Sequence, residues 1–299
     1  MAITQRLDWH VKIRDVLNIL IYSDIFQYPL TRKEIFERGK LDDNELDICL
    51  SALLHEERIF LIDGYYSLRN DPTLITLRSE RNVRANNYIK KARVIAKVLA
   101  RFPFIRAVFL SGSISKNCVD KKGDVDFFII TESKRLWLAQ FFCSMFKRTI
   151  LLNRTKYFCY NYIIDNKHLL IDERSIYTAF EIKTLIPLLG YDYYKRMLNE
   201  NSWASIFFPK YPVSPDNDVI RRQSKVQKIL EYLLNNSLGE YIDNWLLNYS
   251  LRKRKKRLAS KFFENPVYYT NLQRHVAKSH TNDHYPNIIK EYHQKTQRY

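Results

Sequence analysis

The sequence predicts an α+β protein, in which a small sheet with helices lies between an N-terminal module and a C-terminal helical region. Three observations predict this class. Two short apolar runs near the middle of the chain flank a Gly-Ser turn, which indicates buried strands. Residues 1–72 have the pattern of short helices followed by a hairpin. From about Arg221 onward, apolar residues recur at helical spacing.

The composition indicates packed domains with a strong attraction for anions. Of the 299 residues, 46% are apolar and 14% aromatic, which supports real cores and argues against disorder. The length suits roughly one large domain or two to three small ones. We expect an N-terminal module at 1–72, a core at 78–208 and a helical region at 216–299. The formal net charge of +17 favours polyanionic partners such as nucleoside triphosphates, RNA, DNA or an anionic surface.

The cysteines and the hydropathy pattern predict a cytoplasmic protein that does not span a membrane. The four cysteines form no C-x-x-C pair, so we expect reduced thiols and neither a disulfide framework nor a zinc site. The histidines form no metal-binding cluster. No apolar run approaches the roughly 18 residues of a membrane helix, and the first ten residues lack the apolar core of a signal peptide.

The N-terminal module is predicted from local signals. Apolar residues at helical spacing indicate a helix at 14–23, and Thr31 is a good N-cap for a helix at 32–38. A third helix is expected at 44–56, capped by Asp42 or its neighbour. The following segment, 59–68, alternates around an Asp-Gly turn and predicts a hairpin.

This order of three helices and a hairpin resembles a winged helix. In that fold the third helix can enter a DNA groove, where it needs positive charge against the phosphates. Here the third helix, NELDICLSALLHEE, is acidic and has no arginine or lysine. We therefore prefer a packing or protein-interaction module to a DNA reader, although DNA binding stays open.

A basic helix is expected at 78–102, after a linker at 71–77 that contains a proline. Its apolar stripe is predicted from Val83, Ile89, Val94 and Val98. Two interpretations of its lysines and arginines stay open: a solvated face, which we prefer, or a surface that contacts a nucleotide or nucleic acid.

The central segment carries the chemistry. Residues 107–110 predict a strand that ends in the turn Ser111-Gly112-Ser113, and residues 125–130 predict a second strand. Asp124 and Asp126 then lie on one face of the second strand, and its apolar residues face a core. Two adjacent carboxylates repel each other unless a cation lies between them, and oxygen ligands suit a divalent cation.

The turn is suited to phosphate. Gly112 lets the backbone come close to a phosphate, Ser113 offers a hydroxyl and an amide, and Lys116 can add a positive charge. The plain alternative is an ordinary turn followed by two exposed acids at the start of a strand.

The combination of Leu110, Gly112, Ser113, Asp124 and Asp126 resembles the signature of the nucleotidyltransferase superfamily typified by DNA polymerase beta. The resemblance covers roughly residues 90 to 180. It implies a core of a short mixed sheet with helices and a site for Mg²⁺ or Mn²⁺. It also implies transfer of a nucleoside monophosphate from a nucleoside triphosphate to a hydroxyl acceptor, with release of pyrophosphate. A nucleic acid is one possible acceptor, given the net charge.

The resemblance also implies a third carboxylate on a following strand. That strand is predicted at 157–164, where the expected position holds Asn161. A further short strand is predicted at 169–173, and Asp172 within it is our candidate for the third metal ligand and catalytic carboxylate. Asn161 and Glu173 are the alternatives.

Asp172 also has a structural interpretation, as an acid at the N-terminus of a helix predicted at 175–189. If Asn161 occupies the third position, the protein is instead a degraded nucleotidyltransferase fold that binds a nucleic acid or a protein. The sequence indicates neither the acceptor nor the base preference.

The C-terminal region is predicted to be all-helical, with helices at 225–235 and 238–256. Trp245 and Leu246 are expected to be buried. The basic run at 252–257 either neutralises phosphates or is a solvated helix end.

Overall fold

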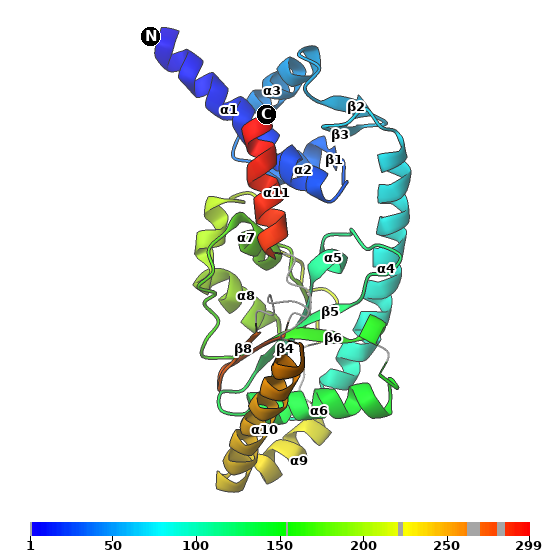
Figure 1. Ribbon diagram of the computed structural model, residues 1–299, viewed down its shortest axis with the longest axis vertical. Coiled ribbons are helices and arrows are strands. Elements are labelled where there is room, and N and C mark those ends of the chain that lie inside the picture. The colour runs from blue at the N-terminus through cyan, green and yellow to red at the C-terminus, as the bar shows by residue number, and fades with distance from the viewer. Residues whose placement is uncertain (1, 154, 221–223, 262–269, 280–284) are drawn as a thin grey trace.

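The computed structural model describes residues 2–153, 155–220, 224–261, 270–279 and 285–299 (Figure 1). The described part of the chain contains helices, a three-stranded antiparallel sheet near the N-terminus and a six-stranded mixed sheet in the centre, so the fold is α+β. Within it, none of the helices combines the length and apolar character needed to cross a bilayer.

The predicted helices and hairpin of the N-terminal module form, but the first helix starts at Ala2 and not at residue 14, and a two-residue strand that was not predicted, Leu30–Thr31, joins the hairpin. Its elements are α1 (Ala2–Ile25), β1 (Leu30–Thr31), α2 (Arg32–Arg38), α3 (Asp43–His55), β2 (Phe60–Ile62) and β3 (Tyr65–Ser67). Thr31 and Asp42 each cap the following helix in a reciprocal box with a glutamate three residues later. The two-residue turn between β2 and β3 has positive φ at both positions, as a tight hairpin requires.

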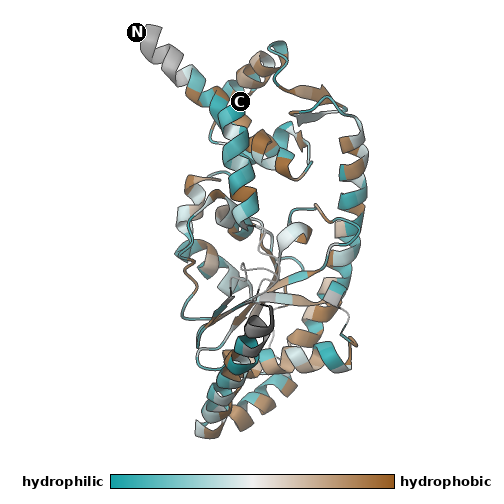
Figure 2. Cartoon of the chain, in the orientation of Figure 1, coloured by the Kyte–Doolittle hydropathy of each residue, from teal (hydrophilic) through white to brown (hydrophobic). Residues whose placement is uncertain are grey.

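Helix α4 (Thr73–Leu99) joins the module to the core and differs from the prediction in two ways. It starts at Thr73, within the expected linker, because Pro72 fits just before the first turn. Its buried face matches the predicted stripe only in part: Ile89 and Val98 pack against the core, but Val83 and Val94 are exposed. Figure 2 shows hydrophobic and hydrophilic residues alternating along this helix. The most buried residues of the face against the core are alanines with one aromatic and two branched aliphatic residues: Ala85, Tyr88, Ala92, Ile95, Ala96 and Leu99.

The central sheet has the order β7-β4-β5-β6-β9-β8, in which β5 and β6 are the parallel pair. Its strands are β4 (Ile105–Ser111), β5 (Asp126–Thr131), β6 (Cys159–Asp165), β7 (Ile186–Leu189), β8 (Thr270–Leu272) and β9 (Val276–Ser279). The short helix α5 (Gly112–Ser115) follows β4, and the 3₁₀ turn η1 (Thr155–Tyr157) precedes β6.

Each face of the sheet packs on its own set of helices. One core lies against α4, α6 (Leu136–Thr149) and α10 (Ser237–Lys261), and the other lies against α7 (Ile176–Lys183), α8 (Tyr191–Glu200) and η2 (Ser202–Ile206). Helix α11 (Tyr285–Arg298) lies beside α1, as Figure 1 shows, and Lys295 pairs with Asp24 at 2.6 Å. The C-terminal helix therefore fastens the N-terminal module to the core.

Two predictions for the segment 166–189 are wrong. Residues 169–173 form no strand, and the expected helix at 175–189 ends at Lys183. The last residues of that segment, Ile186–Leu189, instead form strand β7, which pairs with β4 at the edge of the sheet. Pro187 is tolerated there because an edge strand leaves some N–H groups unpaired, so the missing donor costs little.

The all-helical prediction for the C-terminal region is also wrong. Helices α9 (Lys225–Leu234) and α10 form as expected, but β8 and β9 then add a hairpin to the sheet beside β6. Val276 and Ala277 are buried in this pairing, which covers an edge that β6 would otherwise expose. Leu246 is buried, as predicted, whereas Trp245 is 55% exposed.

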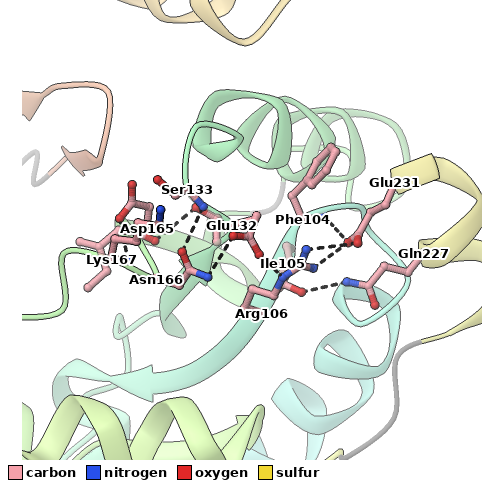
Figure 3. Close-up of polar contacts among 12 residues, drawn as sticks. Phe104, Ile105, Arg106, Glu132, Ser133, Asp165, Asn166, Lys167, Gln227 and Glu231 are labelled. Atoms are coloured by element: carbon pink, nitrogen blue, oxygen red, sulfur yellow. Dashed lines mark hydrogen bonds and ion pairs between the residues drawn. The ribbon is translucent and has the colours of Figure 1, made fainter. Parts of the chain in front are cut away.

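A polar network holds α9 against the start of β4 (Figure 3). Arg106 binds both oxygens of Glu231 at 2.7 and 3.1 Å, and its Nε donates to Glu132 at 2.8 Å. Gln227 donates to the carbonyl of Ile105 at 2.9 Å. Burial opposes the charge of Glu132, but Arg106 outweighs it and keeps the pKa of Glu132 below its ordinary value. A hollow of about 280 Å³ lies here, and the charges of Arg106, Glu132 and Glu231 that line it are already paired.

The basic residues of α4 have two different roles. The guanidinium of Arg81 is buried and contacts Asp120 and the carbonyl of Phe26, both at 2.7 Å. Arg78 is buried as well, where it binds both oxygens of Glu34 at 2.8 and 2.9 Å. Lys90, Lys91 and Lys97 are exposed. The first turns of this helix therefore use arginine to join the module to the core.

We predict that Arg78→Ala lowers the free energy of unfolding by about 3 kcal/mol, because it leaves the half-buried carboxylate of Glu34 without its partner. Arg93→Ala is the matched control, since Arg93 lies on the same helix as Arg78 and its ion pair with Asp218, elsewhere in the chain, is exposed. That control should cost less than about 1 kcal/mol. Urea unfolding measures both, and equal losses would contradict a structural role for Arg78.

Candidate metal centre

The site forms where two antiparallel strands end side by side. Ser111 at the end of β4 lies opposite Asp126 at the start of β5. Gly112 follows with a φ of 67°, in the left-handed region. A side-chain carbon added at Gly112 would lie 2.4 Å from Oδ2 of Asp126. Glycine is therefore required here for its φ and for the space that the carboxylate of Asp126 occupies.

The predicted alternation of β5 is confirmed. Val125, Phe127 and Ile129 are buried in the core that faces α4 and α6. Asp124 and Asp126 are half-buried on the other side of the chain. Val125, Phe127 and Ile129 thus pack into the core, and both carboxylates lie next to the Gly-Ser turn.

Cys159 provides the third group of the cluster. It lies directly opposite Asp126 in the parallel pairing of β5 and β6. Ligand atoms of Asp124, Asp126 and Cys159 all lie within 4.8 Å of one another, and the thiol is hydrogen-bonded to Asp124. Burial, followed by the charges of Asp126 and Asp124, raises the pKa of Cys159 to about 12. Without a cation the thiol is therefore protonated at neutral pH.

Two other candidates for a third ligand, Asp172 and Glu173, are not part of the cluster. Among the described residues, Asp172 does not belong to the cluster; it is exposed, in the segment between β6 and α7. Glu173 pairs with Lys278 at 3.2 Å. The side chain of Asn161 lies outside what the structure describes. Burial and then the charges of Glu173 and Asp172 raise the pKa of Tyr162 to about 12, so the charges of both acids are felt at this tyrosine.

The Gly-Ser turn already holds a carboxylate. Glu181 of α7 accepts a hydrogen bond from the backbone N–H of Gly112 at 3.2 Å and pairs with Lys116 at 2.8 Å. Lys116 also donates to the carbonyl of Gly112 at 2.9 Å. The predicted turn residues are therefore together, but they are engaged with an anion that belongs to the chain itself.

The N-terminal module reaches this turn as well. Tyr22 of α1 packs edge-on against Phe180, the residue before Glu181. Burial and then the charge of Glu181 raise the pKa of the Tyr22 hydroxyl. The helix that carries Glu181 is thus held between the sheet and the N-terminal module.

The donor set decides which cations fit. Two carboxylates suit any divalent cation, including Mg²⁺ and Mn²⁺. The sulfur of Cys159 does not suit Mg²⁺, which takes oxygen ligands in an octahedral arrangement. The three-carboxylate set implied by the resemblance is not what these residues form, although Asp124 and Asp126 fit the part assigned to them.

Sequence reasoning missed Cys159 and Glu181. Cys159 was assigned only as a reduced thiol, and its partner depends on a register that shifts between Asp126 and Phe128. Glu181 has no local signal, because it is one acid on a short helix. Only the packing of α7 against β4 brings it to Gly112.

We predict that Gly112→Ala lowers the free energy of unfolding by about 1–2 kcal/mol more than Gly64→Ala. Gly64 has a φ of 80° with nothing within 4 Å, so the control pays only for the left-handed backbone, about 1–2 kcal/mol. The difference between the two losses should vanish when each substitution is made separately in an Asp126→Ala background. An excess that persists there would show that Asp126 does not occupy this space.

We predict that Glu181→Gln increases the affinity for inorganic tripolyphosphate, measured without metal, by about tenfold, or about 1.4 kcal/mol. Glutamine can still accept from Gly112, while the charge of Lys116 becomes available to an external anion. Glu200→Gln removes the same charge from an exposed pair on α8 and should leave the affinity unchanged. Equal affinity in all three proteins would contradict competition by Glu181.

Comparison with known proteins adds no further assignment. No protein-family model, no curated protein and no solved structure matches the chain. The function therefore has to be argued from the cluster of Asp124, Asp126 and Cys159 and from the turn beside it.

Proposed function

We propose that the protein is a metal-dependent nucleotidyltransferase that moves a nucleoside monophosphate from a nucleoside triphosphate to a hydroxyl acceptor. One observation carries the proposal. The carboxylates of Asp124 and Asp126 lie beside the Gly112 turn, at the level where β4 ends and β5 begins. Carboxylates next to a phosphate-binding turn are what phosphoryl-group transfer needs, because a cation and the transferred group must meet.

The reaction forms one bond and breaks another. The acceptor oxygen attacks the α-phosphorus, the bond from the α-phosphorus to the bridging oxygen breaks, and pyrophosphate leaves. A divalent cation at Asp124 and Asp126 would neutralise phosphate charge and make the acceptor hydroxyl more acidic. The N–H of Gly112, the hydroxyl of Ser113 and the ammonium of Lys116 bind the outgoing phosphates. The carboxylate of Glu181 has to leave the turn when they bind.

The N-terminal module is proposed as a packing element of this enzyme. It has the helices and hairpin of the winged-helix resemblance, but its third helix, α3, carries acidic residues and no arginine or lysine. Arg32 pairs with Asp43 and Asp47 of that helix at 2.9 and 2.6 Å, so its positive charge is already paired within the module. A nucleic acid would meet the acidic face of α3 unfavourably.

A second candidate function is binding without catalysis. It is favoured by two observations: the third group beside Asp124 and Asp126 is a thiol and not a carboxylate, and Glu181 occupies the turn. In that case the net charge of +17 attracts a nucleic acid or an acidic protein, and binding weakens steeply with salt whether or not metal is present.

We predict that one nucleoside triphosphate stabilises the protein only in the presence of a divalent cation. ATP, GTP, CTP and UTP would each be tested by thermal shift with Mg²⁺, Mn²⁺ or EDTA. A ligand at 100 times its Kd should add about 2.7 kcal/mol. The double variant Asp124→Asn/Asp126→Asn should lose the shift, because it removes both negative charges.

Asp172→Asn is the control for this experiment. The structure keeps Asp172 out of the cluster, so the variant should retain the metal-dependent shift. Loss of the shift in this variant would return Asp172 to the site. A shift that does not depend on metal, or that survives in the double variant, would favour the binding function instead.

A further inference from the structure

We propose that Asp124, Asp126 and Cys159 bind a thiophilic divalent cation, of which Zn²⁺ is the model, in preference to Mg²⁺. The proposal concerns the cation of the site on which the proposed function rests. It follows from a departure in the donor set: two oxygens and one sulfur converge where a hard-metal site would have oxygens alone.

The backbone fixes the position of the sulfur. The N–H of Cys159 donates to the carbonyl of Val125 at 2.9 Å, and the N–H of Val125 donates to the carbonyl of Lys156 at 3.0 Å. Asp124 and Asp126 flank Val125 in the chain. The three donors therefore come from one pair of hydrogen-bonded strands, and they stay together without depending on a long, mobile side chain.

The spacing of the donors fits a single ion. Bond lengths to Zn²⁺ are about 2.3 Å for sulfur and about 2.0–2.2 Å for carboxylate oxygen, so in a tetrahedral site two of its ligand atoms lie about 3.3–3.7 Å apart. The three ligand atoms already lie within 4.8 Å of one another. Binding therefore requires the donor atoms to move closer together by up to roughly 1 Å, which we assign to side-chain rotations at Asp124 and Asp126.

The chemistry of the donors sets the preference. A thiolate is a soft ligand that selects zinc and similar ions, whereas Mg²⁺ takes oxygen ligands and keeps its water. When the ion binds, the S–H bond of Cys159 breaks, a bond from sulfur to metal forms, and the proton passes to solvent. Three protein ligands also leave a fourth position open, which is the arrangement of catalytic zinc sites.

Co²⁺ is the probe that tests this directly, because a thiolate bound to Co²⁺ gives a charge-transfer absorption in the near ultraviolet. The full chain would be stripped with EDTA, desalted and titrated with Co²⁺. We expect the absorption in the native protein, its loss on addition of Zn²⁺, and its persistence in a large excess of Mg²⁺. Absence of the absorption, or its displacement by Mg²⁺ as readily as by Zn²⁺, overturns the proposal.

Cysteine variants assign the ligand. Cys159→Ser should lose the absorption and bind Co²⁺ at least about tenfold more weakly, since even residues that only orient a ligand change affinity by that much. Cys118→Ser is the matched control, because Cys118 is a partly buried thiol outside the cluster, and it should behave as the native protein. An unchanged absorption in Cys159→Ser overturns the proposal.

Cys159→Asp provides a second test that does not depend on loss. It replaces sulfur by oxygen at the same position, so it should remove the absorption and increase the affinity for Mg²⁺. Unfolding midpoints in EDTA establish that each variant is folded before metal is added. Unchanged Mg²⁺ affinity in a folded Cys159→Asp protein counts against the proposal.

These readouts need no nucleotide, so they separate the two proposals. A Co²⁺–thiolate absorption with no metal-dependent nucleotide binding supports the metal site and removes the proposed enzyme. A Mg²⁺-dependent nucleotide shift that is the same in the native protein and in Cys159→Ser has the opposite meaning: the enzyme stands, and the thiophilic site falls.

Discussion

The candidate site depends on the close contact between the backbone at Gly112 and the carboxylate of Asp126. The two meet because β4 and β5 pair antiparallel, with Ser111 opposite Asp126, so one strand ends where the other begins. Any side chain at Gly112 would enter the space of Oδ2. The turn after β4 and the acids before and within β5 are consequently a single unit, held in place by cores on both faces of the sheet.

The features that the sequence predicted correctly are those set by a few neighbouring residues. Thr31 and Asp42 cap their helices because the capping groups lie within one turn. The hairpin forms at Gly64 because its turn needs positive φ. Val125 and Phe127 face the core because side chains alternate along a strand. The spacing from Gly112 to Asp126 belongs to the same class, since both flank predicted strands.

The features that were missed depend on contacts between distant segments. Cys159 lies opposite Asp126 in a parallel pairing whose register shifts between Asp126 and Phe128, and no local sequence pattern predicts that register. Strand β9 pairs with β6 through Ile163 and Ala277, far apart in the chain, so its short sequence alone does not announce a strand. The buried face of α4 was misassigned at Val83 and Val94, because the small side chains of its alanines are what face the core and allow a close approach.

The distribution of charge constrains how a site of this kind can work. The chain is strongly basic, yet three acids gather near the turn, and the ammonium of Lys116 there is already paired with Glu181. A triphosphate approaching alone meets mainly negative charge at Asp124, Asp126 and Glu181. In the proposed reaction a cation would therefore have to arrive before the nucleotide or together with it, because only then would the local charge favour phosphate. In the proposed enzyme the general basic surface would attract the polyanion, and a cation held by Asp124 and Asp126 would decide whether it stays bound.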